Sequence, residues 1–453
     1  MKKSWYQIIF LILGLLICLF PLIGMAVTGP APAAANEILA FEPKLKTDSG
    51  SLNLRYLNDL SDYFRDHFSE RQEMVTLNAK LESGLFGDSA SKKVVVGKEG
   101  WLFFGETTDD YQNTNKLSDR RIWAAAHTLS LIQEYALSKN AVFLFTIAPN
   151  KNTLYPQYMP DLYLRSEEPG NRERLFAELR KEGVSSLDLT HSFRAEDRTL
   201  YHRLDSHWTN LGAAFAHDQI LAALGKTDDV FYRPDQFREE KSHSADLYTM
   251  LYPTGKEKDI QYVPDPPLTY QYAAPIRSPE DLKILTTCEG KSGNLMMFRD
   301  SFGNTLHAFM AESFGNARFS RAMPYQLSML DASHADTLVI EIVERNIDWL
   351  SERAPNLPAP VRDLTVPDNQ IDVAADLFCT QENALWRISG ELKETFDVDS
   401  PIYLKIDGVV YEASPVGEAE GSFTAYLPAQ AESAQILYRS NGTLVQSTAI
   451  ACH

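Results

Sequence analysis

Residues 294–303 read Asn-Leu-Met-Met-Phe-Arg-Asp-Ser-Phe-Gly, and this stretch predicts the fold. The mostly apolar run Asn294–Phe298 is typical of a short buried strand, and the polar residues after it predict a turn into a helix. A serine at such a turn, here Ser301, points its hydroxyl out of the carboxyl edge of a sheet, where backbone N–H groups can face an oxyanion. The stretch therefore predicts an α/β fold with a reactive group at the sheet edge.

Apolar runs alternate with helical patterns on both sides of this stretch. Ser118 is expected to cap a helix through Leu137, and Asn210 a second helix that Gly225 ends. Continuous apolar strands separated by helices indicate a mostly parallel sheet that is covered on both faces. The other predicted elements are an amphipathic helix from Tyr56 to Phe68, a hairpin at Lys93–Phe104, and strands at Ala141–Ile147, Ser185–Leu189 and Thr337–Val343.

The N-terminus predicts a membrane segment. Residues 8–27 carry no charge and follow Lys2 and Lys3, and a helix needs about 20 apolar residues to cross a bilayer. The positive flank predicts a cytoplasmic N-terminus and an extracytoplasmic remainder. Two interpretations stay open: an uncleaved signal anchor, which the length of the run favours, and a signal peptide cut near Ala33-Ala34-Ala35.

The C-terminal part changes pattern after residue 353. Four prolines within residues 354–368 predict a stiff linker, and residues 369–453 alternate apolar and polar positions between glycine-containing turns, which predicts a small β-sandwich module. Cys379 and Cys452 lie near its two ends, so we expect a disulfide between them outside the cell. The chain thus divides into four parts: an anchor and linker (1–36), an α/β domain (37–353), a linker (354–368) and a β module (369–453). Within the β module we expect strands at Ala384–Gly390, Ile402–Val410, Ser422–Leu427 and Gln435–Ser440.

Composition excludes several classes of function. The formal net charge is -18, so the chain lacks the positive charge that nucleic-acid binding requires. The four cysteines are far apart, which argues against a structural zinc site or a redox pair. No histidine and carboxylate pair has ligand spacing on one predicted helix, and no glycine-rich phosphate loop is present. We therefore predict no metal and no cofactor.

A second motif, Asp205-Ser206-His207-Trp208, precedes the helix expected at Asn210. Serine becomes a nucleophile when a base takes its proton, and histidine has the suitable pKa. A carboxylate two residues before the histidine can hold its other ring nitrogen. We therefore expect Ser301, His207 and Asp205 to act together, with Trp208 packing behind them and His307 as a reserve base, although Asp300-Ser301 alone is also an ordinary helix cap.

Several further motifs occur in a fixed order along the chain. They are Gly97-Lys98-Glu99-Gly100-Trp101-Leu102-Phe103, Pro149-Asn150-Lys151 with Tyr155-Pro156, Asp205-Ser206-His207-Trp208, Arg299-Asp300-Ser301-Phe302, and Glu341-Ile342-Val343-Glu344-Arg345-Asn346. In this order the chain resembles the AlgX/AlgJ (DHHW) family of SGNH-hydrolase-like proteins, which O-acetylate exported polysaccharides. The resemblance implies an SGNH-hydrolase-like α/β/α sandwich, with Ser301 as nucleophile, His207 as base and Asp205 as its partner.

The resemblance also assigns supporting residues. Asn150 would be an oxyanion donor or a turn residue, and Lys151, Tyr155 and Arg345 would either line a sugar cleft or be ordinary surface residues. Arg299 stands where ordinary SGNH enzymes have glycine, so the oxyanion donors are expected to be arranged differently. A membrane-bound O-acyltransferase is the implied partner, because it would supply acetyl groups outside the cell.

Three functions are consistent with these residues. The favoured one is a membrane-anchored extracytoplasmic O-acetyltransferase that acts on an exported or cell-surface polysaccharide through an acetyl-serine. The second is a carbohydrate acetyl-esterase in which water reacts with the same intermediate. The third is a non-catalytic polysaccharide-binding or scaffold protein of an export complex.

Overall fold

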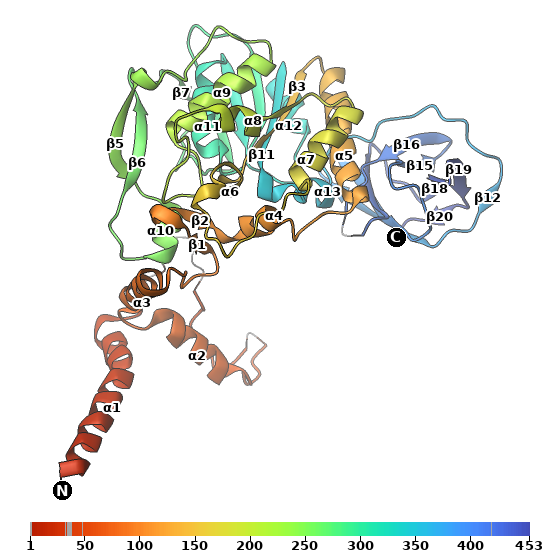
Figure 1. The fold of residues 1–453 in the computed structure, drawn as a ribbon. Helices are drawn as coiled ribbons and strands as arrows, with labels where there is room; N and C mark the ends of the chain where they lie inside the picture. Colours follow the sequence, from red (N-terminus) through yellow and green to blue (C-terminus); the bar gives the residue numbers. More distant parts are fainter. Residues whose placement is uncertain (1, 32, 34–38, 48, 418) are drawn as a thin grey trace.

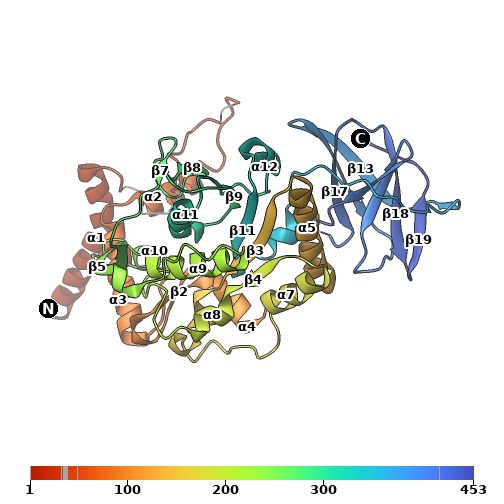
Figure 2. The ribbon, with the colours of Figure 1, turned by 90° about the horizontal axis from the view of Figure 1, so that it is seen from above.

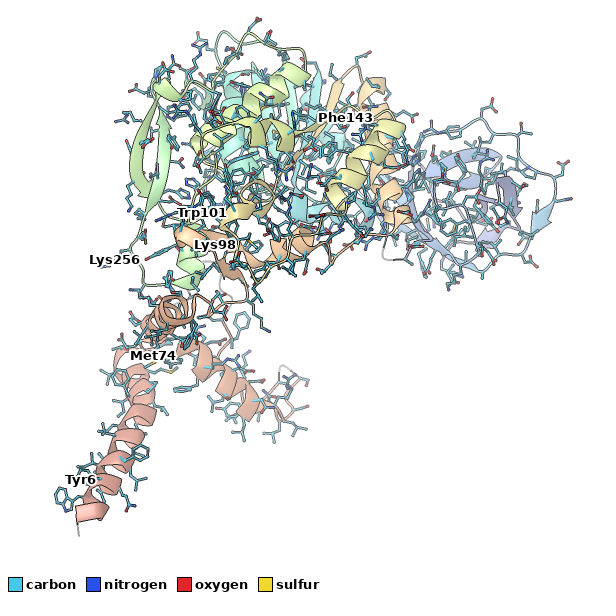
Figure 3. All side chains as sticks on the ribbon, viewed as in Figure 1. Tyr6, Met74, Lys98, Trp101, Phe143 and Lys256 are labelled. Atoms are coloured by element: carbon cyan, nitrogen blue, oxygen red, sulfur yellow. The ribbon has the colours of Figure 1, made fainter. Side chains whose placement is uncertain are left out.

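The computed structural model describes residues 2–31, 33, 39–47, 49–417 and 419–453, except the side chains of residues 2–4, 17 and 18. The first helix, α1 (Lys2–Thr28), projects away from the rest of the protein (Figure 1). Most of its described apolar side chains are exposed, and so is Tyr6 (Figure 3). Within the described residues, Trp5–Thr28 is the one helix that is long and apolar enough to cross a membrane. Residues 32 and 34–36, which belong to the predicted linker and include part of the alternative cleavage site at Ala33-Ala34-Ala35, lie outside the described residues.

Two helices, α2 (Tyr56–His67) and α3 (Arg71–Phe86), form an elbow at the end of α1. The hydroxyl groups of Thr28 and Ser69 are 3.3 Å apart, and the N–H of Ala31 donates to the carbonyl of His67. The amphipathic helix expected from Tyr56 is confirmed as α2. These contacts place the elbow directly at the point where the apolar helix ends.

The α/β region is built around a seven-stranded sheet in the order β4-β3-β11-β9-β10-β8-β7. The strands from β4 to β10 pair in parallel, and β8 and β7 add antiparallel pairs at one edge. The strands are β3 (Val142–Ala148), β4 (Ser186–Asp188), β7 (Gln271–Tyr272), β8 (Lys283–Thr287), β9 (Asn294–Phe298), β10 (Asn316–Ser320) and β11 (Thr337–Val343).

Helices cover both faces of this sheet (Figure 2). Alternate residues of β3 point to opposite faces, so Phe143 and Phe145 join one apolar core while Leu144 joins another. The first core also contains residues of α5 (Asp119–Ser138), α7 (Asn171–Lys181), α12 (Ser328–Ser333) and α13 (Trp349–Glu352), and the second contains residues of α8 (Leu189–Ala195), α9 (Asn210–Ala223) and α11 (Gly303–Glu312).

Smaller elements surround the carboxyl edge of the sheet. The hairpin expected at Lys93–Phe104 is confirmed as β1 (Val94–Val96) and β2 (Leu102–Phe104). A second hairpin, which the sequence did not predict, consists of β5 (Phe237–His243) and β6 (Asp259–Pro264). The short helices here are α4 (Thr108–Gln112), α6 (Lys151–Leu154) and α10 (Asp246–Leu251).

The predicted cap of α5 is confirmed, and that of α9 is wrong by one residue. The hydroxyl of Ser118 accepts from the N–H of Arg121 at the start of α5. At α9, the hydroxyl of Thr209 accepts from the N–H of Gly212, so Thr209 is the cap and Asn210 is the first helical residue. Threonine and asparagine are both favoured helix caps, and neighbouring capping residues are hard to order from sequence.

The C-terminal region consists of two packed, mostly antiparallel layers. One layer holds β13 (Ala375–Glu382), β14 (Leu385–Leu392) and β17 (Ser422–Leu427), and the other holds β12 (Gln370–Ile371), β15 (Ile402–Ile406), β16 (Val409–Ala413), β18 (Ser433–Ser440), β19 (Thr443–Ser447) and β20 (Ile450–Ala451). The single strand expected at Ile402–Val410 is wrong, because Asp407 and Gly408 both have positive φ and turn the chain into a hairpin.

The proline-rich segment after residue 353 is extended, but it is not a free linker. Leu357 is buried in the core of the α/β region. Further on, the N–H of Ala359 donates to Tyr426 and the N–H of Arg362 to Val410, so the segment pairs with strands of the β region. Prolines favour an extended backbone whether or not it is paired, and for this reason composition could not predict the pairing.

Cys379 and Cys452 are free thiols in the structure. They belong to the same apolar cluster, and the N–H of Cys379 donates to the carbonyl of His453, next to Cys452. The expected bond between them is therefore not formed in this structure, although their neighbouring positions fit it. Their oxidation outside the cell stays a prediction.

Arg120 on α5 joins the two regions. Its guanidinium donates to the carbonyls of Val398, Ser400 and Glu420 and is 2% exposed. The Arg120→Met variant should lower the midpoint of thermal unfolding and increase proteolysis within residues 354–368, because each buried carbonyl left unpaired costs about 1–3 kcal/mol.

Arg121→Met is the matched control for this change. Arg121 is partly exposed and bonds to Ser351 and Glu352 within the α/β region, and such surface pairs contribute about 0–1 kcal/mol. Equal unfolding midpoints for the two variants would contradict the role assigned to Arg120.

Candidate active site

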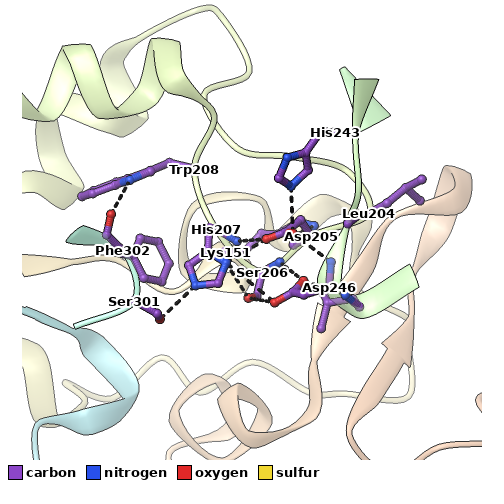
Figure 4. Close-up of polar contacts among 12 residues, drawn as sticks. Lys151, Leu204, Asp205, Ser206, His207, Trp208, His243, Asp246, Ser301 and Phe302 are labelled. Carbon is purple, nitrogen blue, oxygen red and sulfur yellow. Dashed lines mark hydrogen bonds and ion pairs between the residues drawn. The ribbon is translucent and has the colours of Figure 1, made fainter. Parts of the chain in front are cut away.

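Ser301 lies in the turn between β9 and α11, at the carboxyl edge of the sheet (Figure 4). The carboxylate of Asp300 fixes this turn, since one oxygen accepts from the N–H of Phe302 at 2.8 Å and the other from the N–H of Val343 at 2.6 Å. Asp300 therefore connects the serine turn to the end of β11. Glycine is required at position 303, because a Cβ there would lie 2.4 Å from the side chain of Arg299.

His207 approaches Ser301 from the loop before α9. Its Nε2 is 2.9 Å from the hydroxyl oxygen of Ser301, and its Nδ1 is 2.8 Å from Oδ1 of Asp205 (Figure 4). The structure thus brings together the three residues expected to react, although they come from segments 94 positions apart. Trp208 is fully buried and donates to the carbonyl of Phe302 at 3.1 Å, which confirms its predicted packing role.

Asp205 is a buried carboxylate with four hydrogen-bond donors. Oδ1 accepts from the ring and the backbone N–H of His207, and Oδ2 accepts from Nε2 of His243 at 2.9 Å and from the N–H of Asp246 at 2.8 Å. Burial alone would raise the pKa of Asp205, but the hydrogen bonds from the two histidines and their charges hold that pKa well below its ordinary value. Asp205 therefore stays ionised.

The pKa of His207 is raised above its ordinary value. Burial lowers this pKa, whereas the hydrogen bond and the negative charge of Asp205 raise it by more. The imidazole is therefore a stronger base than an isolated histidine, and its Nε2 faces the serine hydroxyl.

Three neighbours of this group were not predicted from the sequence. His243 ends β5, and its ring stacks on His202 with 3.9 Å between centroids. Asp246 begins α10, and its carboxylate accepts from the hydroxyl of Ser206 at 2.6 Å. His243 ends the mostly exposed, charged strand β5, Asp246 follows it at the start of α10, and His202 lies before the Asp205 motif. These three positions share no recognisable spacing, so no sequence signal could have identified them.

Asp205, His207 and Asp246 also offer ligand atoms within 4.8 Å of one another, a spacing that suits a metal ion. Those atoms are already used in hydrogen bonds within the group, because Asp205 holds Nδ1 of His207 and Asp246 holds Ser206. The hydrogen bonds account for the cluster without an ion.

Lys151 does not line a cleft, contrary to expectation. Its ammonium is buried and donates to the carbonyls of Leu102, Arg203 and Asp205 at 2.6, 2.8 and 2.9 Å. Burial lowers the pKa of Lys151 to about 7. Lys151 therefore joins strand β2 to the loop that carries Asp205. The sequence shows only a lysine in a polar turn and gives no sign of this burial.

Two other expected residues are also engaged in internal bonds. The hydroxyl of Tyr155 accepts from the N–H of Leu200 and its ring packs on Trp101, so it is part of the scaffold rather than of a cleft wall. The amide of Asn150 donates to Asp110 at 2.8 Å. An oxyanion role for Asn150 stays a prediction.

His307 is a poor reserve base, because burial and nearby Arg299 lower its pKa to about 4 and its ring bonds to Asn304 rather than to Ser301.

A cavity of about 690 Å³ opens beside Ser301. Four arginines line this arginine cavity: Arg299, Arg321, Arg345 and Arg353. Arg345 lies over the rings of Phe104 and Phe302, Arg353 over Trp349, and Arg321 donates to a carbonyl. None of these three has an ion pair with a carboxylate in the part of the chain that the structure describes.

Three acidic residues, Glu106, Asp300 and Glu341, also line the arginine cavity, but the four arginines outnumber them. Burial and the charge of Asp300 raise the pKa of Glu341 well above its ordinary value, so that carboxyl is neutral. Asp300 is held by backbone N–H groups. A cavity of positive charge therefore lies beside Ser301 in a protein whose formal net charge is -18.

Comparison with known proteins confirms the resemblance to the AlgX/AlgJ family. Residues 94–282 match the family model described as the SGNH hydrolase-like domain of the acetyltransferase AlgX. Probable alginate O-acetylases AlgJ from Pseudomonas syringae pv. tomato and Pseudomonas aeruginosa are 28% and 26% identical, over 44% and 45% of this chain and 51% and 52% of theirs. The chain thus spans about half the length of these curated relatives.

A solved structure of a DHHW family protein from Eubacterium siraeum is also similar. It is 13% identical, with a TM-score of 0.41, over 57% of this chain and 92% of that protein. Residues 94–282, within the α/β region, are thus similar to the SGNH hydrolase-like domain of AlgX.

The hydrogen bond between Asp205 and His207 predicts how His207 titrates. In an NMR titration of labelled imidazoles, His207 should change charge above the ordinary value of about 6.5. Asp205→Asn removes the negative charge that favours the imidazolium, so the midpoint should move to lower pH. An unchanged midpoint in that variant would contradict the electrostatic role of Asp205.

Proposed function

We propose that this protein is a membrane-anchored extracytoplasmic O-acetyltransferase that acts on an exported or cell-surface polysaccharide. The observation that carries the proposal is the chain of contacts from Asp205 through His207 to Ser301, next to a cavity lined by arginines. The match to the AlgX acetyltransferase model and the two relatives named as alginate O-acetylases support the same reaction class.

The geometry supports a two-step reaction. In the first step Nε2 of His207 takes the proton of Ser301, and the serine oxygen attacks the acetyl carbonyl of the donor. The donor leaves with that proton, and the acetyl group remains on Ser301 as an ester. In the second step His207 takes the proton of a sugar hydroxyl, the sugar oxygen attacks the ester, and the proton returns to the serine oxygen.

The arginine cavity supports an acidic polysaccharide as the acceptor. Arginine binds carboxylate and phosphate groups with paired donors, and Arg321, Arg345 and Arg353 have no acidic partner within the described residues. A donor that delivers acetyl groups from a membrane-bound O-acyltransferase fits a protein held next to the bilayer by α1. The acetyl-esterase and the non-catalytic scaffold remain the rival functions.

The division of labour along the chain is part of the proposal. Residues 37–353 would carry the reaction and residues 1–36 the anchor. Residues 354–368 would join them to the β module, residues 369–453, which packs on α5. Two arginines support a fixed position of this module: Arg120 donates to its carbonyls, and Arg362 pairs both with Glu134 of α5 and with Glu412 of the module.

Replacement of the nucleophile tests the chemistry. Ser301→Ala should reduce turnover of a small acetyl ester by roughly 10³-fold or more, because loss of one member of such a triad removes the covalent step. Turnover is followed spectrophotometrically, and acetylated oligosaccharide is followed by mass spectrometry. Acetylated sugar supports transfer, and free acetate alone supports the esterase.

Ser192→Ala is the matched control, since the hydroxyl of Ser192 donates only to the carbonyl of Leu189 on α8. It should turn over the ester as the wild-type protein does. Unchanged turnover in Ser301→Ala would exclude both enzymatic functions as assigned, and loss of activity in both variants would show that serine replacement acts through folding.

Membrane attachment is tested separately. If α1 stays as an anchor, the full-length protein should remain with membranes after alkaline extraction, and its mature N-terminus should precede residue 8. A mature N-terminus at Asn36 would overturn the anchor and favour a secreted product.

A further inference from the structure

A second cavity, of about 630 Å³, lies beside the first turns of the two helices that follow the reactive residues. Asn210 at the start of α9 lines it, three residues after His207, and Asn304 lines it on α11, three residues after Ser301. We call it the tyrosine cavity, because Tyr270 and Tyr272 form part of its wall.

The side chain of Arg299 separates the two cavities. Arg299 lines the arginine cavity, while its guanidinium donates to Oδ1 of Asn304 and to the carbonyl of Pro279, each at 2.6 Å. Asn304 and Pro279 line the tyrosine cavity. A molecule bound at Ser301 that extends past Arg299 would therefore reach the tyrosine cavity.

Aromatic groups in the tyrosine cavity are held in place by one another. The hydroxyl groups of Tyr270 and Tyr272 are 2.9 Å apart, and the hydroxyl of Tyr272 is 3.3 Å from Nε2 of His307. Tyr272 is 40% exposed, so its ring is available to a ligand. A fixed aromatic face of this kind packs well against an apolar surface at low cost in side-chain entropy.

Polar groups in the same cavity have unused hydrogen-bonding capacity. The amide nitrogen of Asn304 and the hydroxyl of Thr305 have no partner among the residues that the structure describes, although Oδ1 of Asn304 is occupied. Arg238 and Asp265 lie at the rim, 3.9 Å apart and largely exposed, and offset each other's charge. The tyrosine cavity is therefore neutral, in contrast to the arginine cavity.

These features select the class of ligand. A sugar ring has apolar C–H faces and several hydroxyl groups, which match an aromatic face together with neutral donors and acceptors. An acyl chain would leave Asn304 and Thr305 unpaired, at a cost. An anionic group finds its partners in the arginine cavity instead.

We propose that the tyrosine cavity binds a sugar ring of the acceptor polysaccharide, next to the ring that receives the acetyl group at Ser301. This inference rests on the proposed function, because it assigns an additional subsite to the same acceptor. Tyr272 would pack on the face of the ring, and Asn304 and Thr305 would bond to its hydroxyl groups.

Equilibrium binding tests the subsite without relying on turnover. The probes are hexasaccharides of β-linked glucose, of N-acetylglucosamine and of mannuronate, titrated calorimetrically into the full-length protein in detergent. Tyr272→Ala and Thr305→Val should each raise the Kd of the probe that binds, by about tenfold for Tyr272→Ala, which corresponds to about 1.4 kcal/mol. Circular dichroism establishes that the variants are folded.

Gln271→Ala is the matched control on the same short strand. Successive side chains of a strand point to opposite sides, and Gln271 does not line the cavity. Its Kd should equal that of the wild-type protein. Equal Kd values for Tyr272→Ala, Thr305→Val and Gln271→Ala would overturn the inference, as would the absence of binding by all three probes.

Failure of this subsite is distinct from failure of the proposed function. Unchanged turnover in Ser301→Ala would refute the covalent mechanism whatever the Kd values are. Unchanged Kd values in the cavity variants would remove the subsite while the Ser301 chemistry remained intact.

Discussion

The buried carboxylate of Asp205 is the constraint on which the proposed site depends. A buried charge is costly unless it is paired and hydrogen-bonded, and Asp205 meets this requirement with donors from His207, His243 and the backbone of Asp246. Because both carboxylate oxygens are occupied, the imidazole of His207 has one favoured orientation. In that orientation Nε2 faces Ser301 and can take its proton.

Rigid parts of the fold fix the positions of the serine turn and of the histidine loop relative to each other. On one side, Asp300 ties the serine turn to the end of β11. On the other, Lys151 binds three carbonyls and fixes the histidine loop against β2. Groups that must react at hydrogen-bond distance are best placed by elements of fixed position. The arginine cavity opens beside Ser301 and the neutral tyrosine cavity lies beyond Arg299, so an acceptor with both acidic and hydroxyl groups would find partners in both.

Much of the fold could be predicted from residue patterns because its central strands are continuous apolar runs. The predicted strands Asn294–Phe298 and Thr337–Val343 agree with β9 and β11 residue for residue. The meeting of Ser301 and His207 followed from their positions at strand and helix ends. The hairpin that brings His243 to Asp205 could not be predicted, because β5 is mostly exposed and charged and lacks an apolar pattern. Likewise, the burial of Lys151 depends on tertiary contacts with distant carbonyls, which no local pattern encodes.

The central claim is that Ser301 carries the acetyl group between donor and acceptor. Brief exposure of the full-length protein to a small acetyl ester, followed by acid quenching and peptide mass spectrometry, tests it most directly. The account predicts one acetyl group on the peptide that contains Ser301, and its loss to the oligosaccharide when acceptor is added before the quench. Turnover of the ester without an acetyl group on Ser301, or with the acetyl group on another residue, would contradict it.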